Sequence, residues 1–172
     1  DQLSYEPIPA GATVLAFGDS VTYGVGASSA NNYPTRLEEL TGWRVINAGI
    51  SGDTAEKAQH RIAELLVKHT PDLVIVELGG NDFLRKRQPS KVKADLLNIL
   101  MQCKETGVST VLVSVPALSI LRATMGSLSD AEIYAELAEE TGVALIPDVF
   151  SNVLSNGDLL ADRIHPNAEG YR

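Results

Sequence analysis

The stretch ATVLAFGDSVTYG, residues 12–24, joins an apolar run to a short polar turn. Its apolar part, residues 12–17, lacks the in-and-out alternation of a half-exposed strand and is typical of a strand covered on both faces. Four further runs share this pattern: residues 43–47, 72–78, 109–115 and 143–146. We therefore predict a parallel sheet of five strands.

Segments with helical spacing of apolar residues alternate with these strands, over residues 33–42, 53–69, 90–107 and 129–142. Glycine or proline marks the end of each segment, and Ser90 is a possible N-cap of the third. This alternation predicts an α/β fold, a doubly wound sandwich formed as one domain over residues 1–172. The last residues, HPNAEGYR, read as a first helical turn, so we expect the natural chain to continue beyond Arg172.

Composition excludes several classes of protein. The chain has 172 residues, 44% of them hydrophobic, and a net charge of −8, which repels nucleic acids and anionic lipid surfaces. No apolar run approaches the roughly 20 residues that span a bilayer. The single cysteine, Cys103, lies in an apolar run with helical spacing and is predicted to be a buried packing residue.

Polar residues follow four of the predicted strands. Ser20 comes after the first strand, Gly52 after the second and Asn81 after the third, while Asp162 and His165 lie beyond the fifth. In an open parallel sheet, ligands bind outside the carboxyl ends of the strands. We therefore expect these residues to meet at one edge of the sheet.

These residue types together suit acyl transfer. A serine hydroxyl is a weak nucleophile until a base removes its proton, and histidine is the usual base. His165 is the candidate because His60 and His69 fall on the polar side or at the end of a predicted helix. Asp162, three residues earlier, can orient the imidazole.

Acyl transfer also needs donors for the oxyanion of the tetrahedral intermediate and a place for the acyl chain. The candidate donors are the backbone N–H groups of Ser20 and Gly52 and the side-chain amide of Asn81. Candidate substrate-binding residues are the apolar side chains Phe83, Leu84 and Leu118, with ordinary packing as the alternative. We expect residues 116–128 to form a surface connection rather than a lid.

Four blocks, FGDSVTYG, NAGISGDT, ELGGNDFLR and DRIHPN, occur in this order over nearly the whole chain. They resemble the GDSL or SGNH hydrolases, and most closely the small bacterial branch with thioesterase I, lysophospholipase L1 and arylesterases. The resemblance implies a flavodoxin-like three-layer α/β/α sandwich. It also implies a catalytic triad of Ser20, Asp162 and His165, with Ser20, Gly52 and Asn81 as the oxyanion hole. The G-x-S-x-G elbow of α/β-hydrolases is absent, as the resemblance leads us to expect.

The resemblance implies a serine esterase or thioesterase that uses no metal or other cofactor. Its small-molecule substrates would be aryl esters, short to medium acyl esters, acyl thioesters or lysophospholipids, with carbohydrate O-acetyl esters as the alternative. A periplasmic or secreted bacterial location and a monomeric state are further expectations.

Two other classes of function remain open at this point. Six polar residues can be read as a two-metal phosphoesterase site, namely Asp19, Asp53, Asn81, Asp82, Asp162 and His165. In that case a single histidine would have to serve both ions. A doubly wound sheet can also hold a small ligand without catalysing any reaction.

Overall fold

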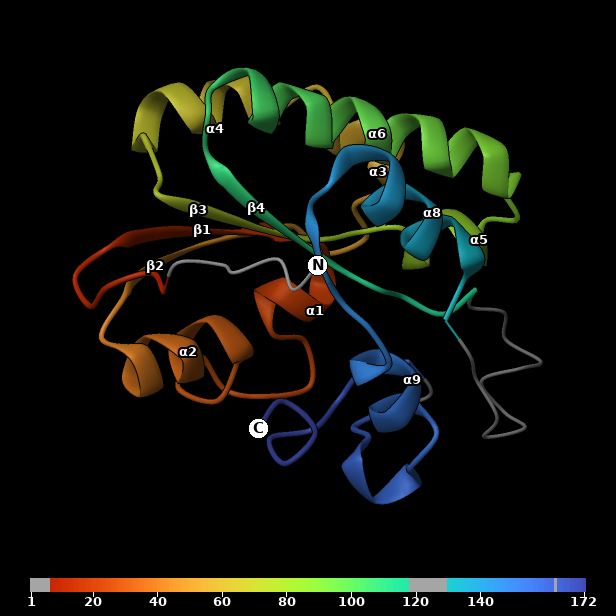
Figure 1. Ribbon diagram of the computed structural model, residues 1–172. Helices are drawn as coiled ribbons and strands as arrows, with labels where there is room; N and C mark the ends of the chain where they lie inside the picture. Colours follow the sequence, from red (N-terminus) through yellow and green to blue (C-terminus); the bar gives the residue numbers. More distant parts are fainter. Residues whose placement is uncertain (1–6, 118–129, 163) are drawn as a thin grey trace.

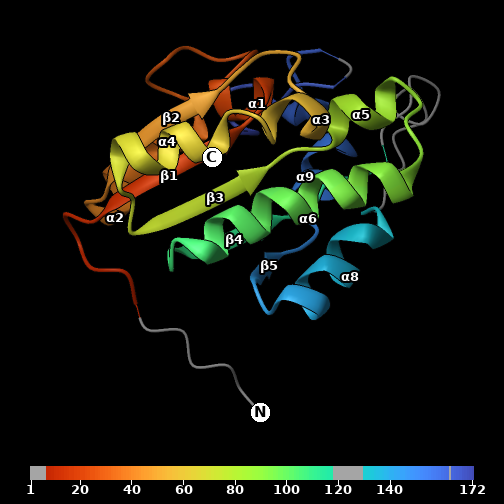
Figure 2. The same ribbon diagram turned by 90° about the horizontal axis from the view of Figure 1, so that it is seen from above.

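A computed structural model describes residues 7–117, 130–162 and 164–172 of the chain. The described residues form one sheet whose five strands are all parallel, as predicted. The strand order is β2-β1-β3-β4-β5 (Figure 2). The strands are β1 (Thr13–Gly18), β2 (Arg44–Gly49), β3 (Leu73–Glu77), β4 (Ser109–Val113) and β5 (Ala144–Ile146). This is the order of a flavodoxin-like sheet.

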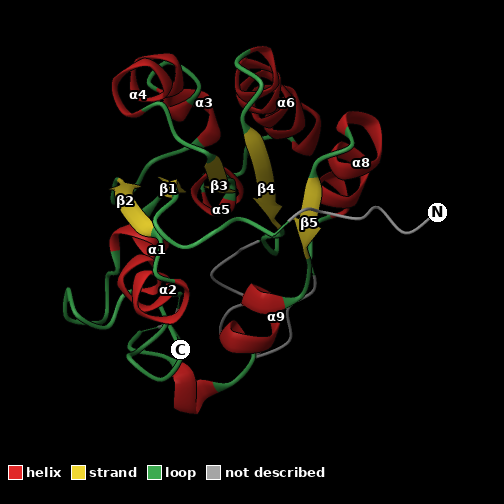
Figure 3. Cartoon of the chain, turned by 60° about the vertical axis from the view of Figure 1, so that its left-hand side comes forward, coloured by secondary structure: helices red, strands yellow, loops and turns green. Residues whose placement is uncertain are grey.

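Helices cover both faces of the sheet and complete three layers (Figures 1 and 3). One face carries α3 (Ala55–Ala58), α4 (Ile62–His69), α6 (Pro89–Glu105) and α8 (Glu132–Thr141). The other carries α1 (Ser20–Tyr23), α2 (Tyr33–Thr41) and α9 (Val149–Leu154). Helix α5 (Gly80–Leu84) follows β3, and a 3-10 turn, η1 (Gly157–Leu159), follows α9. The predicted α/β sandwich is confirmed.

The helix predicted over residues 53–69 is interrupted. Helix α3 ends at Ala58 and α4 begins at Ile62, with Arg61 at the N-cap position of α4. Ala58 and Ile62 are both buried, so the apolar spacing continues across the interruption and hides it from the sequence pattern. The backbone departs from the helix where the Arg61 side chain contacts the ends of two strands.

The predicted N-cap of α6 was also wrong. Proline occupies the first position of this helix, where its missing N–H costs nothing, so Ser90 lies inside the first turn and makes no cap. Cys103, on the same helix, is fully buried, and burial raises the pKa of its thiol to about 11. Its predicted packing role is confirmed.

The core lies between the sheet and the helices on each face. Strand residues Val14, Leu15, Phe17, Val74 and Val76 are inaccessible to solvent, which explains why these runs show no alternation. Burial of apolar surface at about 25 cal/mol per Å² is the main term that stabilises such a core. None of the helices in the described part of the chain is long and apolar enough to cross a bilayer.

Candidate active site

The carboxyl ends of three adjacent strands present the first three blocks of polar residues. Gly18 at the end of β1 is paired with Gly49 of β2 on one side and with Glu77 of β3 on the other. Ser20 is the first residue of α1, directly after β1, and Asn81 lies in α5, after β3. Gly52 follows β2. The predicted meeting of these loops at one edge of the sheet follows from this register.

Local geometry at the end of β1 directs Ser20 out of the strand. The Asp19 carboxylate accepts a hydrogen bond from the backbone N–H of Val21 at 3.0 Å and so caps α1. Gly18 is required by close packing, because a Cβ atom there would lie 2.6 Å from the carbonyl oxygen of Glu77. The chain can therefore turn from strand to helix in one residue.

Ser20 lies within hydrogen-bond distance of His165, although 145 residues separate them in the sequence. Ser20 Oγ is 2.9 Å from His165 Nε2. His165 Nδ1 is 2.8 Å from Asp162 Oδ2 and 3.0 Å from Asp162 Oδ1. The structure thus aligns the three residues that the sequence predicted as a triad.

Asp162 is held as a carboxylate by its own turn. Its Oδ1 accepts hydrogen bonds from the backbone N–H groups of Ile164 and His165, each at 2.8 Å. Partial burial opposes ionisation, but these backbone bonds and the imidazole lower the pKa of the Asp162 carboxyl below its usual value. An ionised Asp162 favours the tautomer with a proton on His165 Nδ1, which leaves Nε2 free to accept from Ser20.

The predicted oxyanion donors are accessible for hydrogen bonding. Asn81 Nδ2 donates one hydrogen to the carbonyl oxygen of Asp53 at 2.9 Å, which leaves its second N–H. The backbone N–H groups of Ser20 and Gly52 have no hydrogen-bond partner among the described residues. Gly52 has a φ of +78°, the left-handed region that favours glycine.

Arg61 connects the segments around these donors, a contact that the sequence analysis missed. Its guanidinium donates to the carbonyl oxygens of Gly18 and Ala48 and to the Asp53 carboxylate, each at 2.9 Å. It also lies over the Phe17 ring, 4.2 Å from the centroid. The sequence signal for this contact was that Arg61, a charged residue, occupies a position that the helical spacing assigns to the apolar face of its segment.

Asp19, the residue before Ser20, forms a buried carboxyl pair with Glu77. Glu77, only 1% exposed, accepts hydrogen bonds from the backbone N–H and the hydroxyl of Thr22 at 3.2 and 2.9 Å, and its side chain hydrogen-bonds to Asp19. Burial and the neighbouring Asp19 raise the pKa of the Glu77 carboxyl well above its usual value. The glutamate within the apolar run of residues 72–78 was the sequence signal for this pair.

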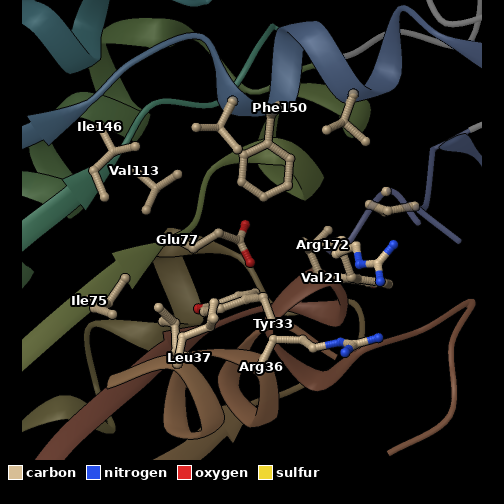
Figure 4. Close-up of a pocket in the computed structure, with 16 residues that line it drawn as sticks. Val21, Tyr33, Arg36, Leu37, Ile75, Glu77, Val113, Ile146, Phe150 and Arg172 are labelled. Carbon is tan, nitrogen blue, oxygen red and sulfur yellow. The ribbon is translucent and has the colours of Figure 1, made fainter. Parts of the chain in front are cut away.

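Glu77 forms part of the wall of an apolar pocket of about 260 Å³ between α2, α9 and the segment after His165 (Figure 4). Its carboxyl group points toward Tyr33 in this pocket, with Phe150 on the opposite wall. Apolar surroundings of this kind favour the protonated form of a carboxyl group.

The predicted acyl-pocket residues are only partly described. Phe83 is 8% exposed and packs in the hydrophobic core, and Leu84 is partly buried against that core. Leu118 lies outside the described residues, as do residues 119–128 of the connection that was weighed as a lid. An acyl pocket at these positions stays a prediction.

The carboxylates considered for a two-metal site are engaged with protein groups. Asp53 pairs with Arg61, and Asp82 accepts from Arg87 and from the backbone N–H of Ala55, each at 2.8 Å. In residues 7–117, 130–162 and 164–172, no group of three or more His, Cys, Asp or Glu side chains is arranged to hold a metal ion. These contacts favour the triad interpretation.

Comparison with known proteins identifies the family of this chain. Residues 16–172 match the GDSL-like lipase/acylhydrolase family. The chain is 34% identical over 165 residues to thioesterase 1/protease 1/lysophospholipase L1 of Escherichia coli, with 91% of this chain and 76% of that protein covered. It is 31% identical over 162 residues to an arylesterase of Vibrio mimicus, with 91% of this chain and 80% of that protein covered.

A solved structure gives the same result for the fold. The crystal structure of AlinE4, a SGNH-hydrolase family esterase, superposes with a TM-score of 0.78 at 32% identity, over 95% of this chain and 90% of that one. Both the sequence match and the structural match extend over nearly the entire chain. The protein therefore belongs to the GDSL-like lipase/acylhydrolase family and is an ester hydrolase of the SGNH type.

Proposed function

We propose that the protein hydrolyses carboxylic esters and thioesters through an acyl-enzyme formed on Ser20. The observation that carries this proposal is the continuous arrangement of Ser20 Oγ, the His165 ring and the Asp162 carboxylate, with contacts of 2.9 and 2.8 Å. A nucleophile, its base and a group that orients the base define the chemistry of a serine hydrolase.

In the first half of the reaction, Ser20 Oγ attacks the substrate carbonyl carbon while its proton passes to His165 Nε2. Asp162 stabilises the imidazolium that results. The carbonyl oxygen becomes an oxyanion and accepts hydrogen bonds from the N–H groups of Ser20 and Gly52 and from the free N–H of Asn81. Collapse of the intermediate expels the alcohol or thiol, which takes the proton from Nε2.

In the second half, a water molecule takes the place of the leaving group. His165 removes a proton from water, and the hydroxide attacks the acyl-serine through a second tetrahedral intermediate. The same donors stabilise its oxyanion, and Ser20 leaves with the proton from His165. The products are the free acid and the original enzyme.

For substrates, we propose aryl esters, short to medium acyl esters, acyl thioesters or lysophospholipids. Support comes from the names of the relatives, a thioesterase with lysophospholipase activity and an arylesterase. We include a periplasmic or secreted bacterial location in the proposal; that both relatives come from bacteria supports the bacterial part of it. Fractionation of cells that express the full-length gene tests the location.

The nucleophile is tested by Ser20→Ala, measured on p-nitrophenyl acetate and by labelling with a fluorophosphonate. We expect the variant to lose about 10⁶-fold in kcat, as for removal of a nucleophile that acts as one unit with its base. It should also take no label. The control Ser90→Ala changes an exposed serine on α6 and should keep parental kcat and labelling. A labelled and active Ser20→Ala would contradict the mechanism.

Chain-length preference is tested with p-nitrophenyl esters from C2 to C12 on the parent, Leu84→Ala and Leu118→Ala. If these side chains contact the acyl group, smaller residues should shift the optimum toward longer chains. At Phe83, the third candidate residue, we use leucine instead of alanine. Loss of a whole aromatic side chain from a core costs about 3–5 kcal/mol of stability, and Phe83→Leu is the milder change. An identical profile in all four proteins would place the acyl chain elsewhere.

A further inference from the structure

Arg61 occupies an unusual position, in the interruption between α3 and α4. From there its side chain reaches the carboxyl ends of β1 and β2. Nη2 donates to the carbonyl oxygen of Gly18, two residues before Ser20, and Nη1 donates to that of Ala48, each at 2.9 Å. A single side chain therefore holds two neighbouring strand ends at a fixed separation.

The same guanidinium binds the loop that carries Gly52. Nε and Nη2 lie 2.9 and 2.8 Å from Asp53 Oδ2. Asp53 directly follows Gly52, and its carbonyl oxygen accepts the hydrogen bond from Asn81 Nδ2 at 2.9 Å. The contacts thus run from Arg61 to Asp53 and from Asp53 to two of the three oxyanion donors.

Burial makes these contacts difficult to replace. The Asp53 side chain is 6% exposed and that of Arg61 is 21% exposed, so water has little access to the pair. If the guanidinium is removed, a buried carboxylate and two strand-end carbonyls each lose a charged donor, while the backbone N–H groups of Thr54 and Ile50 still donate to Asp53 and Gly18. The planar fork of arginine can serve three acceptors in fixed directions, whereas the ammonium of lysine is a point charge without that geometry.

We propose that Arg61 is a positioning residue for the oxyanion hole, which acts through Asp53 on the Gly52 N–H and the Asn81 side-chain amide. This inference rests on the proposed function, since it assigns those groups as the donors. It predicts an effect on stabilisation of the transition state that is separate from the proton transfer to His165.

The main test is Arg61→Ala with chemical rescue. A displacement of catalytic groups by about 1 Å can cost 10²-fold, so we expect kcat on p-nitrophenyl acetate to fall about 10²-fold with KM within about twofold. Guanidinium chloride at tens of millimolar should restore kcat at least about tenfold, because the ion supplies the missing donors. Urea at the same concentration should not. Arg44→Ala, an exposed arginine at the opposite end of β2, is the matched control and should match the parent.

A second measurement reports on the oxyanion directly. A trifluoromethyl ketone forms a hemiketal oxyanion with the serine, so its Ki in Arg61→Ala should rise by the factor by which kcat/KM falls. The pH dependence of kcat/KM should keep its acidic limb, which reflects the base rather than the donors. If the alanine variant does not fold, Arg61→Lys is used, with an expected loss in kcat of about tenfold.

The outcomes separate this inference from the proposed function. If Ser20→Ala is inactive but a folded Arg61→Ala or Arg61→Lys has parental kcat and an unchanged Ki, the positioning role is wrong while the mechanism stands. The inference also fails if urea restores activity as well as guanidinium does. If Ser20→Ala itself stays active, the proposed function fails first.

Discussion

Two halves of the candidate site are built in different ways. Ser20, Gly52 and Asn81 follow three adjacent strands, and buried groups far apart in sequence hold the segments that carry them. Arg61 contacts the ends of β1 and β2, and Asp53 accepts from Asn81. We call this the strand-borne half. Its geometry depends on tertiary contacts across the sheet.

The half that carries Asp162 and His165 depends on its own turn, and we call it the loop-borne half. Asp162 accepts from the backbone of Ile164 and His165, and the N–H of Ala161 donates to the carbonyl oxygen of His165 at 2.9 Å. The Asp162 side chain is 52% exposed, against 6% for Asp53. The difference teaches that the proposed oxyanion donors are positioned by contacts across the sheet, whereas the aspartate that orients the proposed base is held locally and near water.

Among changes that leave Ser20 and His165 in place, the largest effect is expected when the strand-borne half loses a donor. Asn81→Ala removes the side-chain amide, and loss of one oxyanion donor costs about 10²–10³ in kcat, or about 2.7–4 kcal/mol of barrier. Steady-state kinetics on p-nitrophenyl acetate measure this loss, and circular dichroism should show a parental fold. Asn98→Ala on α6, an exposed asparagine, is the control. A parental kcat in Asn81→Ala would remove this residue from the oxyanion hole.

A smaller effect is expected in the loop-borne half. In Asp162→Ala, water can take the hydrogen bond from His165 Nδ1, because the aspartate is half-exposed. We therefore expect kcat to fall only about 10- to 10²-fold, well short of the roughly 10⁴-fold cost of changing a buried triad aspartate. Asp158→Ala, an exposed aspartate in the same segment, serves as the control. A loss as large as 10⁴-fold would show that exposure does not weaken the contact.

The smallest effect is expected in the free energy of unfolding, and it concerns Glu77 beside the strand-borne half. Because the folded state raises the pKa of Glu77, the folded protein keeps a proton at pH values where the unfolded chain has lost it, above about 4.3. The stabilisation is complete below that pH and is lost as pH rises, by up to about 1.4 kcal/mol per pH unit. Glu77→Gln cannot titrate and should lack this decline.

Urea unfolding of the parent and Glu77→Gln between pH 5 and pH 8 measures the difference. Glu64→Gln, at an exposed position of α4, should follow the parent. Parallel curves for the parent and Glu77→Gln would mean that the proton is not held by this pair. Asp19, the other member, raises the pKa of Glu77 because two adjacent carboxyl groups resist double ionisation.

The sequence allowed most of the fold to be predicted, because buried parallel strands give continuous apolar runs and glycine ends helices predictably. Residues 12–17 and 72–78 were identified in this way, and β1 and β3 lie within one residue of them. The interruption at Arg61 was missed because apolar spacing depends on which face is buried, and that face continues from Ala58 to Ile62. Spacing alone does not report a turn that keeps the same face inward.

For the candidate site, the sequence predicted the residues that are recognisable by their chemistry, but not the contacts that hold them in place. His165 was found because the chain has only three histidines, and Ser20 and Asp162 were found because they lie in blocks that resemble those of the SGNH hydrolases. The contacts of Arg61 and Glu77 were not, because both depend on which strand ends become neighbours in space. A charged side chain inside an apolar pattern marks a buried polar contact, but it does not name the partner.

The distance along the chain between Ser20 and His165 has a consequence for synthesis. All five strands precede His165, and Tyr171 also reaches back to donate to the carbonyl oxygen of Val25 at 2.7 Å. While the ribosome still encloses the later segment, a nascent chain can assemble its sheet yet lacks a base for its serine. During translation the proposed nucleophile is therefore made before its base, and the proposed site is complete only after the segment that carries His165 has emerged from the exit tunnel.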